Sequence, residues 1–360
     1  MARFIKTLKK TALAASIASL ATVANATIVT SIKPLGFIAS SIADGVTDTE
    51  VLVPAGASPH DYSLKPSDIQ KLQGAELILW VGEDIDAFLD KTLRPMPFKK
   101  VLSIADFAEI GGLLEGEAHD HKHEHDHDHK HDHDHKHDHE HKHEHDHKHD
   151  HAHKHDHAHK HDHAHKHDHD HKHDHEHKHD HAHGHEHDHS TNWHVWYSPE
   201  ISKIVATRLA TRLTEAYPEK KEKIAQNLAE FNRTLAEQSE KIKQQLAPVK
   251  EKGFYVFHDA YSYFNNAYGL KQTGYFTINP LVAPGAKTLA KIKQEIKEHK
   301  VNCLFAEPQF TPKVIESLSK GTGVHVGRLD PMGDAVKLGV NSYANFLQYT
   351  ADSYFACLSK

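Results

Sequence analysis

The sequence predicts an α/β protein of two lobes joined by one long helix, with a disordered His-rich insertion in the first lobe. Three observations support this fold class. Short apolar segments alternate with helical segments on both sides of the chain's middle, as in α/β layers. Residues 218–247 carry apolar side chains mainly at three- and four-residue intervals, so they predict a helix of ~40 Å. Residues 119–189 contain nothing from which a core could be packed.

The first 26 residues predict a signal peptide. Arg3 and three lysines lead into an apolar run that is shorter than the roughly 20 residues needed to span a bilayer. The run ends in Ala24-Asn25-Ala26, a pattern that signal peptidase cleaves. No Cys follows to carry a lipid anchor, so we expect an exported protein in a bacterial periplasm.

The first lobe is expected over residues 27–217. Pro34 opens the first helix, and Ser67 is predicted to cap a later one, with Asp68 in its first turn. Residues 76–82 (ELILWVG) are almost entirely apolar, which is typical of a strand buried on both faces of a parallel sheet. The predicted strands are 27–32, 50–53 and 76–82, and the predicted helices are 34–45, 67–74 and one that begins at Pro199 after the cap Ser198.

The second lobe is expected over residues 248–360, after the linking helix 218–247. Pro248 and Gly253 end that helix, and strands and helices then alternate again. Two lobes make a cleft, which is where ligands usually bind. The predicted strands are 254–257, 272–277, 301–305 and 323–328, and the predicted helices are 261–268, 287–299, 311–320 and 341–358.

The segment 119–189 has His at every odd-numbered position, with only Asp, Glu, Lys, Ala and one Gly between. Imidazole is the commonest metal ligand among side chains, so the tract predicts a disordered, high-capacity trap for Zn²⁺, Ni²⁺ or Cu²⁺. It carries a net charge of −10, which leaves about +3 of the whole chain's −7 for the remainder. A nearly neutral remainder without a basic stripe makes nucleic acid an improbable partner.

The chain has two cysteines, Cys303 in a predicted strand and Cys357 near the end of the last helix. In an oxidising compartment an even pair predicts a disulfide, which would join that helix to the sheet. Two buried free thiols are the alternative.

Five histidines lie outside the tract, and three of them are candidate metal ligands: His60, His194 and His258. His60 follows the second strand, His194 precedes a helix cap, and His258 ends the first strand of the second lobe. Ligands of open α/β sheets bind at the carboxyl ends of strands, so the three could meet in the cleft. Asp330, just past another strand, is a candidate fourth ligand, and water is the alternative.

Three imidazoles with a carboxylate or water suit tetrahedral Zn²⁺, whereas Mn²⁺ prefers more oxygen ligands. Ni²⁺ or Co²⁺ stay possible on this ligand set. Three histidines with an open position also occur in zinc hydrolases, but the sequence has no H-E-x-x-H motif, so an enzyme is not expected. Another class is a periplasmic metal buffer that acts mainly through the tract.

Four segments resemble the metal-specific solute-binding proteins of ABC importers, in the same order along the chain. They are Gly56–Asp68 (GASPHDYSLKPSD), Trp193–Pro199 (WHVWYSP), Phe257–Tyr261 (FHDAY) and Leu329–Pro331 (LDP). The overall likeness is to the ZnuA-type zinc-binding proteins of the cluster A-I family, and it covers the mature chain apart from the length of the tract.

The resemblance implies two lobes on a rigid helix, with zinc in the cleft as the transported ligand. It also implies delivery to a zinc permease in the inner membrane, driven by a cytoplasmic ATPase, and we expect a monomer. His60, His194 and His258 match the family's three imidazole positions; manganese-preferring relatives carry a carboxylate at the third. Some zinc-type members have Glu before the first His, where this chain has Pro59.

These observations predict a periplasmic high-affinity zinc receptor. The tract would serve it as a reservoir, sensor or acquisition arm, because tethering raises the local concentration of captured metal. Bound imidazoles must be neutral, so zinc affinity is expected to fall as the pH drops through the histidine range.

Overall fold

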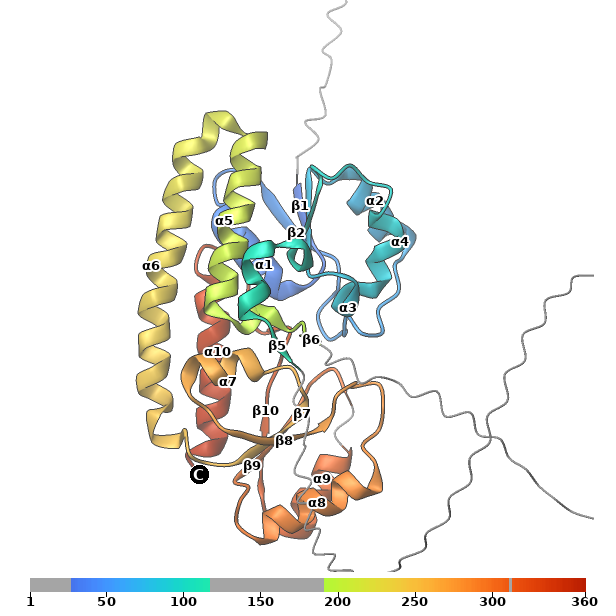
Figure 1. Ribbon diagram of the computed structural model, residues 1–360, viewed down its shortest axis with the longest axis vertical. Coiled ribbons are helices and arrows are strands. Elements are labelled where there is room, and N and C mark those ends of the chain that lie inside the picture. The colour runs from blue at the N-terminus through green and yellow to red at the C-terminus, as the bar shows by residue number, and fades with distance from the viewer. Residues whose placement is uncertain (1–26, 117–190, 311–312) are drawn as a thin grey trace, which may run out of the picture. The chain divides into compact units, whose positions relative to one another are not determined.

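Two four-stranded parallel sheets form the framework of the computed structural model, which describes residues 27–116, 191–310 and 313–360. The described residues belong to one compact unit. The expected signal peptide (1–26) and the whole His-rich tract (119–189) lie outside the described residues. Two sheets of this kind confirm the predicted α/β class (Figure 1).

The first sheet has the strand order β2-β1-β3-β4, and every pair in it is parallel. β3 is buried at all four positions, as its apolar sequence predicts, whereas β2 is an edge strand with alternating exposure. The short β4 was not predicted, because three residues give too little pattern to recognise. The strands are β1 (Thr27–Thr30), β2 (Asp48–Val51), β3 (Leu77–Trp80) and β4 (Val101–Ser103).

Short helices connect these strands. The prediction that Ser67 caps α2 is wrong by two residues: the helix begins at Pro66, and the Asp68 carboxylate accepts the backbone N–H of Lys65 at 2.9 Å. Proline is well suited to the first helical position because it has no N–H to satisfy. The helices are α1 (Lys33–Ile42), α2 (Pro66–Gly74), α3 (Glu83–Asp86) and α4 (Asp90–Leu93), with 3₁₀ turns at Ala87–Leu89, Ile104–Asp106 and Ala108–Leu113.

The second sheet has the order β10-β9-β7-β8 and is also parallel throughout. Its two central strands are buried at every position, and its elements lie close to the predicted ranges. The strands are β7 (Phe254–His258), β8 (Gln272–Thr277), β9 (Cys303–Ala306) and β10 (His325–Arg328), and the helices between them are α7 (Ser262–Tyr268), α8 (Ala286–Lys297) and α9 (Lys313–Thr322).

Three long helices pack beside the sheets. α6 contacts α1 and α5 on one side of the chain's middle and α7 and α10 on the other, so one helix runs along both halves (Figure 1). The Ser198 side chain caps α5 as predicted, accepting the N–H of Ile201 at 3.2 Å. The helices are α5 (Pro199–Ala216), α6 (Lys221–Leu246) and α10 (Ser342–Leu358), with 3₁₀ turns at Val195–Tyr197 (η4), Pro218–Lys220 and Ala247–Val249.

Cys303 and Cys357 form a disulfide, as predicted. It joins the first residue of β9 to the last turn of α10. A closed loop of this length stabilises the fold by about 4 kcal/mol in the chain-entropy account.

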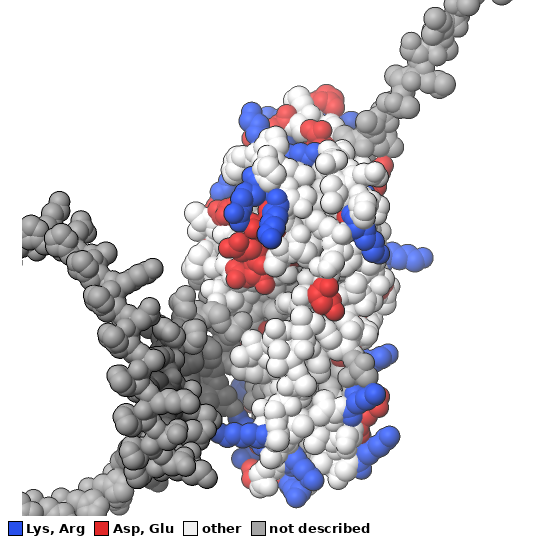
Figure 2. Space-filling view, turned by 90° about the vertical axis from the view of Figure 1, so that its right-hand side faces the viewer, with Lys and Arg blue, Asp and Glu red and all other residues white. Residues whose placement is uncertain are grey.

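A two-stranded antiparallel ribbon of β5 (Glu115–Gly116) and β6 (Thr191–Asn192) lies where the chain leaves and re-enters the described structure. No helix among the described residues is long and apolar enough to cross a membrane. On the face drawn in Figure 2, Lys and Arg are interspersed with Asp and Glu, and wide uncharged areas lie between them.

Candidate metal centre

The three candidate histidines come from three separate segments of the chain. His258 is the last residue of β7, at the carboxyl edge of the second sheet. His194 follows β6 and immediately precedes η4. His60 lies within the loop that joins β2 to α2 in the first lobe. Parallel strands bring their carboxyl ends to one edge, so residues far apart in sequence converge there.

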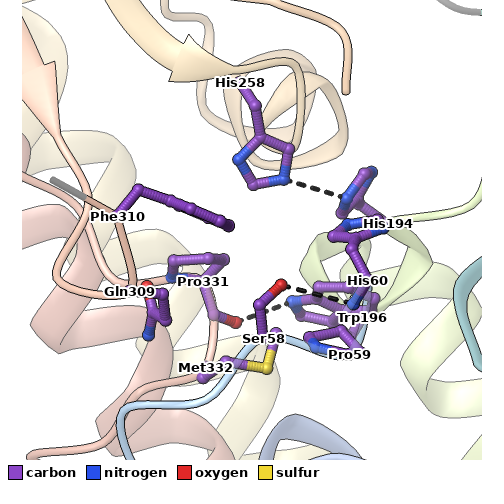
Figure 3. Close-up of a pocket in the computed structure, with 10 residues that line it drawn as sticks. All are labelled: Ser58, Pro59, His60, His194, Trp196, His258, Gln309, Phe310, Pro331 and Met332. Carbon is purple, nitrogen blue, oxygen red and sulfur yellow. Dashed lines mark hydrogen bonds between the residues drawn. The ribbon is translucent and has the colours of Figure 1, made fainter. Parts of the chain in front are cut away.

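The structure brings these three side chains together. One ring nitrogen from each of His60, His194 and His258 lies within 4.8 Å of the others, and among the described residues no other such group of His, Cys, Asp or Glu occurs. The Nε2 atoms of His194 and His258 are 3.2 Å apart, and both of these residues are buried (Figure 3). The separations allow a single ion to contact all three rings, given Zn–N bonds of ~2.0–2.1 Å.

The rings border a small cavity of about 10 Å³. That volume holds roughly one water-sized sphere, so the space suits a bare ion rather than an organic ligand. Apolar and aromatic groups close it, and the indole N–H of Trp196 donates to the Pro331 carbonyl at 3.1 Å across its base (Figure 3). Its lining consists of Ser58, Pro59, His60, His194, Trp196, His258, Gln309, Phe310, Pro331 and Met332.

Glu307 orients His258. It directly follows β9, is 1% exposed, and places its carboxylate oxygens 2.7 and 2.8 Å from Nδ1 of His258. A carboxylate can only accept, so Nδ1 of His258 is the donor of this contact, and its Nε2 is directed toward Nε2 of His194. Such a partner fixes the ring and raises the basicity of the coordinating nitrogen.

Asn192 does the same for His194. Its Oδ1 lies 2.7 Å from Nδ1 of His194 and also accepts that residue's backbone N–H at 3.1 Å. The amide group cannot be reversed, because its Nδ2 donates to the Asp259 carbonyl at 2.9 Å and to the Ser262 hydroxyl at 3.1 Å. Nδ1 of His194 is therefore the donor, and its Nε2 is the acceptor.

His60 is held differently. Its ring makes no hydrogen bond among the described residues, and the residue is half-buried. Its backbone N–H donates to the Ser58 hydroxyl at 3.3 Å. On its other side a hollow of about 470 Å³ separates it from α3, lined in part by Tyr62 and Asp84. Its position therefore depends on its loop rather than on a partner of the ring.

Burial keeps the rings of His60 and His194 uncharged. Desolvation, followed by the charge of the neighbouring His258, lowers the pKa of His60 to about 4. The same causes, burial first, hold the pKa of His194 well below its ordinary value. Neutral imidazole is the form that binds metal, so protons compete weakly at these two positions near neutral pH.

Asp330 lies beside the centre, but its carboxylate faces its own loop. Oδ1 accepts Nε2 of Gln309 at 2.8 Å and the N–H of Met332 at 3.0 Å, and Oδ2 accepts the N–H of Asp334 at 2.7 Å. It is not among the three residues whose ligand atoms converge. The sequence placed this residue near the centre without predicting where its oxygens point.

The sequence analysis did not identify Glu307 and Asn192 as partners of the rings. The sequence could have indicated Glu307, because this residue follows an apolar strand just as His258 ends one. Asn192 gave no recognisable signal, since its role depends on a contact with Asp259, a residue distant in sequence.

Residues 28–357 match the family described as ZnuA, zinc-uptake complex component A, periplasmic. The high-affinity zinc uptake system protein ZnuA of Haemophilus influenzae is 66% identical over 355 residues, covering 99% of both chains. The protein of the same description from Haemophilus ducreyi is 51% identical, covering 98% of this chain and 99% of its own.

A crystal structure of ZnuA superposes with a TM-score of 0.64 at 22% identity, covering 92% of this chain and 98% of its own. At that identity the likeness concerns the fold. Two parallel sheets, a helix along both and a cleft of convergent imidazoles are the arrangement of a metal-specific solute-binding protein. The chain belongs to the ZnuA family, which confirms the resemblance predicted from the sequence.

Proposed function

We propose that His60, His194 and His258 bind one Zn²⁺ ion and that the protein is the periplasmic receptor of a zinc importer. One observation carries the ligand assignment. The Nδ1 atoms of His194 and of His258 are both held as donors, so the two Nε2 atoms are the ones that point toward each other, 3.2 Å apart. When both rings are in the neutral form that binds metal, the two Nε2 lone pairs face and repel each other, and a cation between them removes the repulsion.

Water is proposed as the fourth ligand. Pro59 has no ligating side chain, and the oxygens of Asp330 already accept three hydrogen bonds. A tetrahedral site with three imidazoles and one exchangeable position binds zinc tightly and still offers a point at which another ligand can enter. That property suits a protein that must both capture the ion and release it.

The loaded receptor would dock on a zinc permease of the inner membrane, whose ATPase drives transport. Residues 1–26 would direct export and be removed. The domain limits stay as predicted from the sequence: lobes over 27–217 and 248–360, with the linking helix 218–247. The tract 119–189 would act as a reservoir, sensor or acquisition arm for the same ion.

Competition titration with a chelator tests the assignment. The protein without residues 119–189 would be titrated with Zn²⁺ and with Mn²⁺. The proposal expects one tight site that prefers zinc. That site should be lost in H60A/H258A and kept in H299A/H325A, a matched control that removes two histidines outside the cleft.

The competing function is a metal buffer that acts through the tract. If the shortened protein has no tight site while the full chain binds several zinc ions, the buffer replaces the receptor. If H299A/H325A loses the site as well, the ligand assignment fails.

A further inference from the structure

The structure assigns to Asp334 the task of holding His60 in place for zinc, a positioning role that rests on the proposed function. Of the three imidazoles, His194 and His258 have partners for Nδ1, whereas the ring of His60 has no hydrogen bond among the described residues. The hollow beside His60 also leaves it without packing on that side. Something else must fix this ligand.

Residues 52–60, which carry His60, are fixed by a hydrogen bond from their turn to Asp334. They form a turn in which the N–H of Ala57 donates to the Pro54 carbonyl at 3.2 Å, and Gly56 takes a left-handed conformation with φ of 78°. The Gly56 N–H points out of the turn and donates to Oδ2 of Asp334 at 2.6 Å. Within the described structure, this is the only hydrogen bond that joins residues 54–60 to the segment between β10 and α10.

Asp334 is itself anchored from two sides. Its N–H donates to Oδ2 of Asp330 at 2.7 Å, and its carbonyl accepts Nζ of Lys33, in α1, at 2.7 Å. Asp330 is held in turn by the Gln309 side chain. A rigid chain of contacts therefore runs from the second sheet to the loop that carries His60.

This arrangement also gives Asp330 a different task from coordination. Its carboxylate organises the segment that presents Asp334, and Asp334 then reaches the opposite loop. A ligand that is not held must lose freedom each time the ion binds, so fixing the loop beforehand strengthens binding and slows release.

The test measures the slow release of zinc from the full-length protein to an excess of chelator. A charge-assisted hydrogen bond at a partly exposed position predicts about tenfold faster release in D334A. D334N keeps an oxygen that can accept from Gly56 and should release zinc within about threefold of the unchanged protein. D44A is the matched control, because Asp44 is a half-exposed carboxylate that pairs with Lys223 in α6; its release rate should not change.

Thermal unfolding of the zinc-free proteins accompanies the rates. The inference holds if D334A releases zinc faster at an unchanged melting temperature and D334N restores slow release. It is overturned if D334A releases zinc as slowly as the unchanged protein, or if D334N is as fast as D334A, since the charge alone would then matter. A lower melting temperature in D334A with slow release in D334N still supports the hydrogen bond. Fast release from the unchanged protein would instead contradict the proposed receptor function.

Discussion

Replacing Glu307 by Gln should weaken zinc binding without weakening the fold. The carboxylate of Glu307 accepts from Nδ1 of His258 at 2.7–2.8 Å, and the two residues are only 1% and 2% exposed. Gln has nearly the same size and can still accept the hydrogen bond, so the cavity keeps its shape. What it lacks is the negative charge that makes the coordinating Nε2 more basic.

The expected loss follows from that contact. Changing the hydrogen-bonded partner of a metal-binding His costs 10–100-fold in affinity, or about 1.4–2.7 kcal/mol. The zinc-free protein should respond in the opposite direction. A carboxylate in this buried position is costly to desolvate, and a neutral amide removes that cost. E307Q should therefore melt no lower than the unchanged protein when zinc is absent.

Competition with a chelator of known affinity measures the first effect, and thermal unfolding in a chelating buffer measures the second. E295Q is the matched control, since Glu295 accepts a hydrogen bond from the hydroxyl of Tyr255 in the same half of the chain. If E307Q binds zinc within twofold of the unchanged protein, the carboxylate does not tune His258. A lowered melting temperature would show a structural role instead.

Three further outcomes are expected. Burial lowers the pKa of His60 to about 4 and that of His194 well below its ordinary value. Zinc affinity, measured by chelator competition, should therefore fall less than tenfold between pH 7.5 and 6, whereas a site of three ordinary imidazoles would lose more of its affinity. The unfolded chain takes up these protons first, so the zinc-free protein should lose stability as the pH drops from about 6.5 toward 4 in denaturant titrations. C303S/C357S should lower the free energy of unfolding in denaturant titrations by about 4 kcal/mol. Its zinc affinity, measured by chelator competition, should not change, because the disulfide lies at the start of β9 and the metal centre beyond its end. D330N should weaken zinc binding by no more than the roughly tenfold expected of D334A, because it disturbs the segment that presents Asp334, and a hundredfold loss would make Asp330 a ligand after all.

The strands and helices were predictable because their patterns are local. β3 is continuously apolar and β7 ends in a polar residue after an apolar run, so both the sheet and the side on which ligands gather followed from the residues. The same rule placed His60 and His258 at strand ends, whereas His194 was placed only by its position before a helix cap. β4 was not predicted, because it has only three residues.

The partners of the ligands were not predictable in the same way. The hydrogen bond of Glu307 to His258 and that of Asn192 to Asp259 each join residues that are distant in sequence. The periodicity of a sequence does not show which acceptor a ring nitrogen will meet on a neighbouring strand or loop. The same holds for Gly56 and Asp334, whose contact depends on how the loop after β2 lies against the segment after β10.

The position of Asp330 follows from the strand-end rule, but the direction of its side chain follows from the turn that it opens. The rule places a polar residue near the centre, but the direction of its side chain depends on which donors compete for it. The segment Asp330-Pro331-Met332-Gly333 is a turn sequence, with Pro at the second position and Gly at the fourth. The turn is closed by the Gly333 N–H on the Asp330 carbonyl at 3.1 Å, and the carboxylate accepts N–H groups of the same segment. An Asp that opens a turn satisfies its oxygens locally, as Asx turns do, before any metal arrives. The turn sequence is therefore a reason to expect Asp330 to be a poorer ligand than the histidines, whose rings have no such local donors.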